Sequence, residues 1–242
     1  MKPRLACILA AGVGSRLRPL TDDKPKALVP VSGRTILARA VDHLVAFGVK
    51  KLVIATGYRE DALRRALANV PVEVVYRPNP DYATTQNSVS LALCRDVLST
   101  EDFLRLDGDV VFDPEILSRL AAVDAPLVAA VDRARMLDAE AMKVRLEPDG
   151  LHVQSFGKAI PLSESGGESI GIELVRKDAS GLLFAGLDRA ISGGETGLYY
   201  EDVYSRLVPA GLRVGVADVT GVRWCEVDSP EDLENASRLF PA

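Results

Sequence analysis

The sequence contains few of the residues that build disulfide frameworks, imidazole sites and membrane spans. Its 242 residues include three cysteines and two histidines, His43 and His152. The cysteines are widely spaced, odd in number and match no metal-ligand pattern, which predicts a reducing, cytoplasmic location. Neither histidine lies near another candidate ligand, so catalysis by imidazole is not expected. No apolar run approaches the roughly 18 residues of a membrane span, so no membrane partner is expected.

Further absences narrow the class of protein. The formal net charge of −5 argues against a general nucleic-acid binder, and cations gather near the N-terminus, where a local anionic ligand suits them better. A dinucleotide-binding fingerprint needs a third glycine, but Leu17 stands in that position after Gly12 and Gly14. No G-x-x-x-x-G-K-S/T string occurs. The sequence therefore supports neither a hydride-transfer enzyme nor a P-loop ATPase.

A glycine-rich loop is present after the first apolar stretch. Residues 9–20 read Leu-Ala-Ala-Gly-Val-Gly-Ser-Arg-Leu-Arg-Pro-Leu, and residues 24–28 read Lys-Pro-Lys-Ala-Leu. Glycine permits the close approach and the positive φ that an anion-binding nest of backbone N–H groups needs. Gly-x-Gly alone would be an ordinary strand-to-turn connection. With Arg16 and Lys26 able to neutralise phosphate charge, the loop predicts a nucleoside triphosphate site.

These two strings resemble the signature of the nucleotidyltransferases that activate sugar phosphates and phosphoalcohols. The resemblance implies transfer of a nucleotidyl group from an NTP to a phosphate acceptor, with release of pyrophosphate. It assigns Arg16 to the β- and γ-phosphates and Lys26 to the charge that develops at the reacting phosphate. It further implies nucleotide contacts from the loop itself: Leu9, Ala10, Ala11, Gly12, Gly14 and Ser15.

Apolar stretches alternate with helical patterns through the first half of the chain. We predict strands over residues 5–10, 51–56, 72–76, 103–106 and 127–131. We predict helices between them over residues 36–47, 60–68, 88–98 and 114–122. This alternation indicates βαβ units and an α/β fold, with a Rossmann-like, mostly parallel central sheet flanked by helices.

The pattern changes in the second half. Residues 143–156 carry a hairpin signature, and two helical patterns follow. We predict a small β-hairpin and helical lobe that binds the acceptor. The chain is predicted to be one domain, 1–242, with a nucleotide-binding core over 1–135 and an acceptor-binding and closing part over 136–242.

Two acidic segments are expected to meet at the carboxyl ends of the strands. Asp107-Gly108-Asp109 follows an apolar strand, whereas Glu226 and Asp228 alternate along a second strand. Each alone would be an ordinary solvated loop, but Mg²⁺ prefers carboxylate oxygens beside phosphates. The resemblance implies Mg²⁺ on Asp109 and Asp228, with Asp107 as the alternate ligand and a nucleotide contact, and with Glu226 in support.

Residues 79–88 are dense in amide and hydroxyl groups, which can read a base edge or cap a helix. The Gly-Thr-Ala-type string of sugar-nucleotide relatives is absent here. The Asn-x-x-Tyr-x-x-x-x-Asn spacing instead resembles the phosphocholine-type cytidylyltransferases and favours CTP. The resemblance implies base and ribose contacts from Gly57, Asn79, Gln86, Asn87 and Ser88.

The acceptor site is less well defined. The resemblance assigns Lys143 to the acceptor phosphate, and Lys158 is a weaker candidate. The residues expected to line the pocket are Glu168, Tyr199, Tyr200, Glu201 and Trp224. Phosphocholine-like acceptors rank first, followed by inositol 1-phosphate and 2-aminoethylphosphonate-type phosphonates.

The expected partners are CTP and one such acceptor, and a homodimer is left open. Two alternatives stay open as well. One is a sugar 1-phosphate uridylyl- or thymidylyltransferase, and the other is a catalytically silent, nucleotide-sensing subunit.

Overall fold

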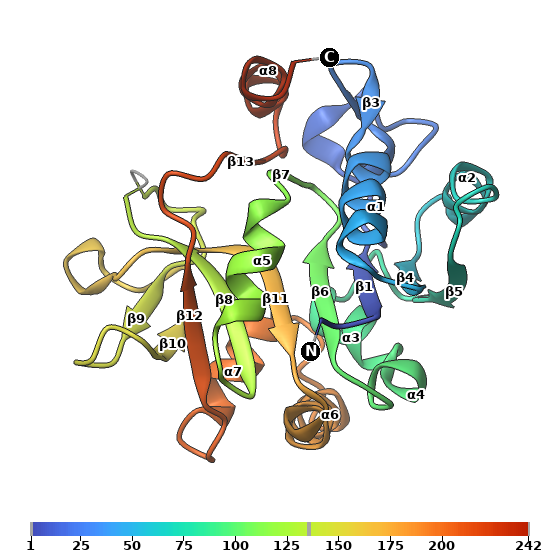
Figure 1. Cartoon of the computed structure of the whole chain (residues 1–242). Coiled ribbons are helices and arrows are strands. Elements are labelled where there is room, and N and C mark those ends of the chain that lie inside the picture. The colour runs from blue at the N-terminus through green and yellow to red at the C-terminus, as the bar shows by residue number, and fades with distance from the viewer. Residues whose placement is uncertain (1, 135–136, 242) are drawn as a thin grey trace.

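A seven-stranded sheet forms the centre of the computed structural model, which describes residues 2–134 and 137–241 (Figure 1). The strand order is β12-β8-β11-β6-β1-β4-β5, and all neighbours are parallel except β11, which runs antiparallel to β6 and β8. The strands are β1 (Leu5–Leu9), β4 (Lys51–Thr56), β5 (Glu73–Pro78), β6 (Phe103–Asp107), β8 (Leu127–Asp132), β11 (Glu168–Val175) and β12 (Val214–Asp218). The predicted α/β class and mostly parallel sheet are confirmed.

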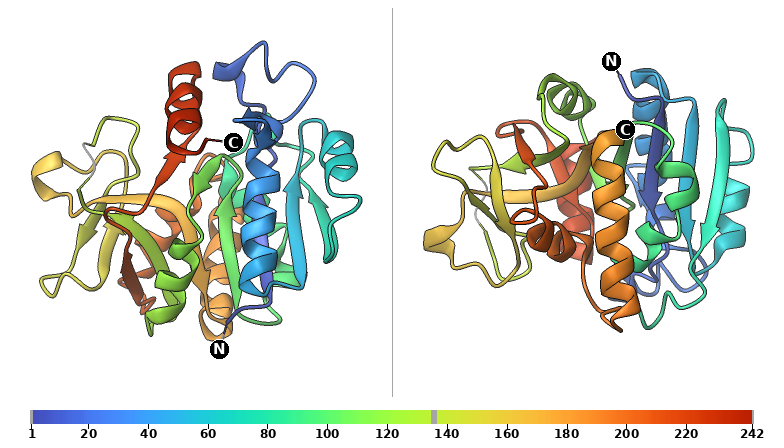
Figure 2. Two further views of the ribbon diagram at one scale, coloured as in Figure 1. Left: turned by 45° about the horizontal axis from the view of Figure 1, so that its top comes forward. Right: turned by 90° about the horizontal axis from the view of Figure 1, so that it is seen from below.

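Helices cover both faces of this sheet (Figure 2). One face packs against α1 (Ile36–Phe47), α2 (Glu60–Ala66) and α5 (Glu115–Ala122). The other packs against α3 (Asn87–Ala92), α4 (Arg95–Leu98), α6 (Lys177–Ser192) and α7 (Tyr200–Leu207). Successive side chains of a strand point to opposite faces, so Ala6 and Ile8 of β1 join the first core and Leu5, Cys7 and Leu9 the second. Burial on both faces explains why β1 reads as a continuous apolar run.

The predicted helix over 88–98 is divided in the structure. It ends as α3 at Ala92 and resumes as α4 at Arg95. At the break the Cys94 N–H donates to Leu91 O, three residues back, and the Cys94 thiol donates to Ser90 O. A hydrogen bond to the carbonyl three residues back is typical of a 3₁₀-type turn, which is tighter than an α-helix. Cys94 is fully buried at this turn.

A smaller layer joins the two ends of the chain. Strand β7 (Val110–Phe112) pairs antiparallel with β13 (Trp224–Glu226), and α8 (Pro230–Leu239) follows. The short hairpin of β2 (Pro30–Val31) and β3 (Arg34–Thr35) lies against α8, as Figure 1 shows near the C-terminus. A third apolar cluster, which includes Leu17, Val29 and Ala236, holds them together. The C-terminal helix is thereby fixed beside the glycine-rich loop.

The predicted hairpin forms from β9 (Val144–Leu146) and β10 (Val153–Phe156). It packs beside β12, and the chain after it returns β11 and β12 to the central sheet. The division into parts 1–135 and 136–242 stays a prediction. Among the described residues no helix combines the length and the hydrophobicity that crossing a bilayer requires.

Candidate active site

The glycine-rich loop follows the carboxyl end of β1, and close contacts with neighbouring segments fix its backbone in place. Gly14 has φ 71°, and a Cβ there would lie 2.7 Å from Lys26 Cβ. The Thr21 hydroxyl donates to Gly14 O at 2.8 Å. In the turn that follows the neighbouring strand β6, Gly108 N donates to Leu9 O at 3.0 Å, and a Cβ on Gly108 would meet that oxygen at 2.6 Å. Only glycine therefore lets these two chain segments meet so closely.

The pairing of β7 with β13 brings the two acidic segments together. Val110 is opposite Glu226, and Val227 N donates to Asp109 O at 3.0 Å. As a result, carboxylate oxygens of Asp109, Glu226 and Asp228 lie within 4.8 Å of one another. The predicted approach of Asp109 to Asp228 is observed, and their role as metal ligands stays a prediction.

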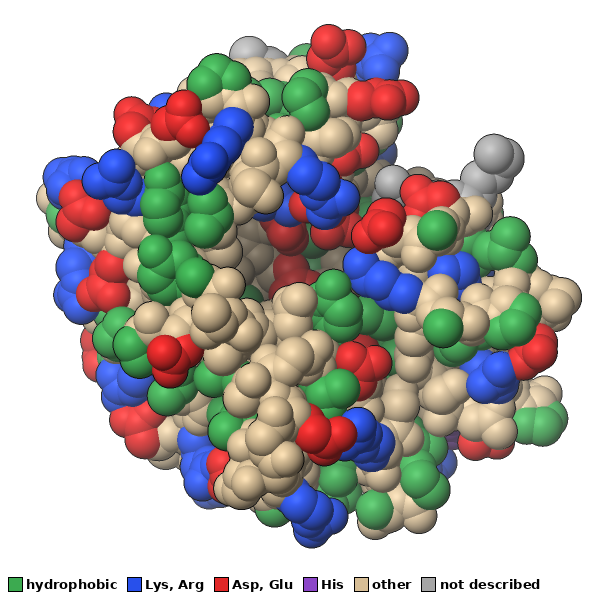
Figure 3. All heavy atoms as spheres, turned by 180° about the vertical axis from the view of Figure 1, so that it is seen from behind, with side chains coloured by type: hydrophobic (Ala, Val, Ile, Leu, Met, Phe, Trp, Pro, Cys, Tyr) green, Lys and Arg blue, Asp and Glu red, His purple; other side chains and the backbone are tan. Residues whose placement is uncertain are grey.

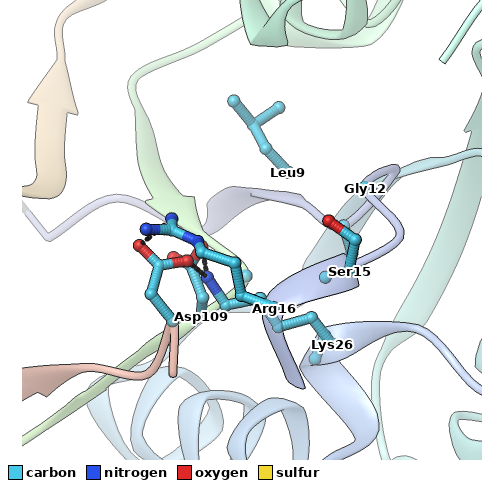
Figure 4. A pocket seen from close by; sticks show the side chains of 11 residues that line it. Leu9, Gly12, Ser15, Arg16, Lys26 and Asp109 are labelled. Carbon is cyan, nitrogen blue, oxygen red and sulfur yellow. Dashed lines mark hydrogen bonds and ion pairs between the residues drawn. The ribbon is translucent and has the colours of Figure 1, made fainter. Parts of the chain in front are cut away.

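Arg16 of the loop and Lys26, from the short turn that follows it, reach this acidic group (Figure 4). Lys26 Nζ lies 2.7 Å from Asp109 Oδ2 and also contacts Asp228 Oδ1, while an Arg16 NH2 group lies 2.7 Å from Asp228 Oδ2. Burial alone would lower the pKa of Lys26, but the charges of Asp109 and Asp228 outweigh it and raise that pKa above its usual value. We call Arg16, Lys26, Asp109, Glu226 and Asp228 the open cluster.

The open cluster has the donor set for a divalent cation. Asp109 Oδ1 is buried and has no hydrogen-bond partner among the described residues. Burial, together with Asp109 and Asp228, raises the pKa of Glu226 to about 9, so the three carboxyl groups do not all carry charge near neutral pH. An orphaned carboxylate oxygen beside two further carboxyl groups fits a hard cation such as Mg²⁺.

A second charged network lies beside the first: four of its five residues are fully buried, and the fifth, Asp107, is partly buried and lines the larger cavity described below. Arg105 and Glu173 are fully buried and form an ion pair, with 2.8 Å between Arg105 NH2 and Glu173 Oε1. Arg105 also pairs with Asp107 at 2.9 Å, Tyr200 donates to Asp107 at 2.8 Å, and Tyr204 donates to Glu173 at 2.8 Å. Burial raises the pKa of Asp107 to about 6, although Arg105 opposes that shift. We call these five residues the sealed cluster.

Two connected hollows meet at the open cluster. A pocket of about 280 Å³ lies between the loop and the acidic group, and a cavity of about 770 Å³ extends from it toward α7. Figure 3 shows a hollow on this face with carboxylates gathered inside it. Acidic side chains outnumber basic ones nine to two among the described residues that line the larger cavity. The acidic ones are Asp107, Asp109, Asp138, Glu140, Glu168, Glu201, Glu226, Asp228 and Asp232, and the basic ones are Arg16 and Lys158.

The residues predicted to contact the base divide into two groups. Gln86 and Asn87 line the larger cavity, and Asn87 Oδ1 also accepts from Tyr200 N at 3.0 Å. Asn79 is buried and bonds within its own segment, donating to Thr85 and Ser90 and accepting from Asp81 N.

The other two predicted base contacts also bond or pack inside the protein. Ser88 is buried and donates to Leu198 O at 2.7 Å. Gly57 packs against Tyr82, whose Cβ would lie 2.6 Å from an added Cβ. The predicted nucleotide contacts of Asn79, Ser88 and Gly57 are not tested by this geometry.

The predicted acceptor residues are similarly divided. Glu168 and Glu201 line the cavity. Lys143 is 3% exposed, and its Nζ donates to Lys158 O at 2.6 Å and to Ala141 O at 3.3 Å. Tyr200 belongs to the sealed cluster, and Trp224 is buried with its Nε1 donating to Asp132. For Lys143, Tyr200 and Trp224, therefore, the observed contacts lie inside the protein.

Further lining residues were not singled out by the sequence. Asp138 and Glu140 lie in an irregular segment, where no periodicity marks a carboxylate as facing a cavity. Tyr82 stands inside the polar segment after β5, and its position in the Asn-x-x-Tyr spacing was the available signal.

The fold and site together define a nucleotide-binding α/β protein, with a phosphate-type loop facing a carboxylate cluster at a sheet edge. The chain belongs to the family of the MobA-like NTP transferase domain, whose model matches residues 6–179.

Curated relatives match nearly the whole chain. It is 36% identical to the CMP-5'-(3-aminopropyl)phosphonate synthase of Streptomyces rubellomurinus, over 98% of this chain and 39% of that protein. It is also 36% identical to the bifunctional IPC transferase and DIPP synthase of Rubrobacter xylanophilus, over 97% of this chain and 51% of that protein. The chain thus spans about half or less of the length of these two relatives.

Solved structures share the fold across the entire chain. The inositol-1-phosphate CTP transferase from T. maritima is 25% identical, with a TM-score of 0.81 over 100% of this chain and 99% of that one. The CTP:phosphocholine cytidylyltransferase from Streptococcus pneumoniae is 23% identical, with a TM-score of 0.76 over 98% and 99% of the two chains. The likeness to the second structure concerns the fold alone.

Proposed function

We propose that this protein is a cytidylyltransferase that transfers CMP from CTP to a phosphorylated small alcohol or a phosphonate and releases pyrophosphate. The observation that carries the proposal is the pocket between the glycine-rich loop and the open cluster. It joins the loop backbone, the cations Arg16 and Lys26, and the carboxylates of Asp109 and Asp228 at the carboxyl edge of the sheet, and Glu226 lines the adjoining larger cavity. The names of the relatives, which include a CMP-phosphonate synthase and an inositol-1-phosphate CTP transferase, support cytidine over other nucleotides.

In the proposed reaction, an acceptor oxygen attacks the α-phosphorus of CTP, and the bond from that phosphorus to pyrophosphate breaks. A phosphate or phosphonate oxygen is already anionic near neutral pH, so no general base is required. The loop amides and Arg16 bind the β- and γ-phosphates, and Arg16 is exposed enough to turn toward them. Lys26 stabilises the negative charge around the reacting phosphate. Positioning and charge stabilisation perform most of the catalysis in such transfers.

Asp109 and Asp228 would hold Mg²⁺, with Glu226 beside them. When bound, the cation supplies charge neutralisation between two anionic reactants. Gln86 and Asn87 face the cavity and are proposed to contact the base and ribose, whereas residues after 136 close over the acceptor. The cytoplasmic location and the homodimer stay predictions.

A pyrophosphate-release matrix tests the proposal. Each of the four NTPs is combined with 3-aminopropylphosphonate, phosphocholine, inositol 1-phosphate and a hexose 1-phosphate, and products are identified by mass. We expect release with CTP and a CDP- or CMP-linked product from a non-hexose acceptor. Activity confined to UTP or dTTP with the hexose phosphate would favour the uridylyl- or thymidylyltransferase. No release in any combination would favour the silent, nucleotide-sensing subunit.

A further inference from the structure

One carboxylate on the wall of the larger cavity has an oxygen without a partner. Glu201 lies in the first turn of α7, is 4% exposed and lines the cavity. Its Oε2 accepts no hydrogen bond from any residue that the structure describes. A buried acceptor left unpaired is costly, so a ligand that donates to this oxygen gains more than one that merely fills space.

Of the aromatic residues expected at the acceptor, Tyr200 and Trp224 are not among the described residues that line this cavity, whereas Tyr199 is. The Tyr200 ring is fully buried, with the Arg105 guanidinium 3.7 Å from its centroid. The Tyr199 ring has the Lys158 ammonium 5.1 Å from its centroid. Trp224 is also buried. Apart from Tyr199, Tyr82 is the aromatic residue among the described lining residues, and it packs against Gly57.

This arrangement suits a primary ammonium better than a quaternary ammonium. A quaternary ammonium has no N–H, and proteins recognise it through open aromatic faces. A primary ammonium has three N–H donors and binds carboxylates through charge-assisted hydrogen bonds. Asp138 and Glu140 also line this cavity, so its field favours a cation there, with Lys158 as the opposing charge.

We propose, on the basis of the cytidylyltransferase function above, that the acceptor carries a primary ammonium group that donates a hydrogen bond to Glu201 Oε2. The phosphate or phosphonate end of the same molecule lies at the open cluster, because both sites line one continuous cavity. The protein therefore discriminates against the trimethylated form of the acceptor and against acceptors without an amine.

The experiment compares three ligands that differ only at the amine end: 3-aminopropylphosphonate, its N,N,N-trimethyl analogue and propylphosphonate. Binding is measured by calorimetry with a non-hydrolysable CTP analogue present. We expect the primary amine to bind about ten- to a hundredfold more tightly than either of the others. The variant Glu201→Gln should remove this preference, whereas Glu195→Gln, an exposed partner of Arg206, should retain it.

Glu201→Gln preserves the shape of the side chain, and thermal unfolding checks that the variant is folded. Equal affinity for the trimethyl analogue, or for propylphosphonate, would overturn the inference. An unchanged preference in Glu201→Gln would overturn it too. Pyrophosphate release from CTP is measured separately on the same protein. A retained amine preference without turnover would overturn the proposed function and leave the ammonium site standing.

Discussion

Asp107 and Asp109 are separated by a single glycine, yet they belong to two charged clusters of opposite character. In the sealed cluster, the Arg105 and Glu173 side chains have no exposure, and each pairs within the protein. In the open cluster, the Arg16 side chain is 57% exposed, and Asp109 keeps a buried oxygen without a hydrogen-bond partner among the described residues. Similar groups thus occur in both, but the open cluster differs in having a largely exposed cation and, in Asp109, an unpartnered carboxylate oxygen beside a pocket.

The difference indicates what each cluster does. Buried charges that form ion pairs with each other fix the arrangement of β6, β11 and α7, because leaving one unpaired in the interior is costly. Charges that are partly solvated and incompletely paired are free to exchange partners with a ligand. We therefore expect variants of the sealed cluster to change the free energy of unfolding, and variants of the open cluster to change the rate or metal binding.

The largest effect is expected for Arg105→Met. It leaves Glu173 buried without its counter-charge, which should lower the free energy of unfolding by about 3–5 kcal/mol. Urea unfolding followed by circular dichroism measures this. The double variant Arg105→Met with Glu173→Leu should recover much of the loss, because both charges are then removed. A loss below about 1 kcal/mol for the single variant would show that the sealed cluster does not depend on this pair.

The second largest effect is expected for Lys26→Ala. Loss of its charge at the reacting phosphate should lower kcat about a hundredfold, or about 3 kcal/mol in the barrier. Pyrophosphate release with CTP and acceptor measures the rate. Lys24→Ala removes a neighbouring lysine outside both hollows and serves as the control, with a rate near that of the unchanged protein. Undiminished release in Lys26→Ala would place catalysis elsewhere.

A smaller change is expected for Asp109→Asn, which removes the negative charge of a proposed metal ligand. The Mg²⁺ concentration for half-maximal activity should rise by about ten- to a hundredfold. Calorimetric titration of the nucleotide-free protein with Mg²⁺ gives an independent measure. Asp113→Asn, which alters a carboxylate paired with Arg223, is the control. An identical metal response in the two variants would contradict the proposed role of Asp109.

The sequence predicts the open cluster much better than the sealed cluster. The glycine-rich loop is a contiguous string whose backbone chemistry is local, and Asp109 and Asp228 each end or follow a recognisable strand. The sealed cluster pairs Arg105 with Glu173 across 68 residues and Tyr200 with Asp107 across 93. Nothing local marks those partners. The antiparallel entry of β11 between β6 and β8, which places Glu173 opposite Arg105, breaks the βαβ pattern.

The lack of local signals also explains why the sequence does not reveal the surroundings of the predicted acceptor residues. The role of Lys143 at the acceptor phosphate stays a prediction, and a single lysine on a short strand does not reveal which carbonyl groups surround it. In the fold its Nζ is enclosed by Lys158 O and Ala141 O. Side chains of an irregular segment, such as Asp138 and Glu140, are placed by tertiary packing alone, so periodicity could not have assigned them to the cavity.

The smallest predicted effect tests the connection of the open cluster to the C-terminal helix. Ser229 caps α8 immediately after Asp228, and its hydroxyl accepts from Asp232 N at 3.2 Å while Asp232 accepts from Ser229 N at 2.8 Å. Ser229→Ala removes one half of this capping box and should lower the free energy of unfolding by about 1 kcal/mol. Ser237→Ala, in the same helix, should cost less because its hydroxyl donates to a carbonyl that is already within the helix.

If Ser229→Ala also weakens Mg²⁺ binding while Ser237→Ala does not, the cap positions Asp228. If both variants bind Mg²⁺ like the unchanged protein, the open cluster is held by the pairing of β7 with β13.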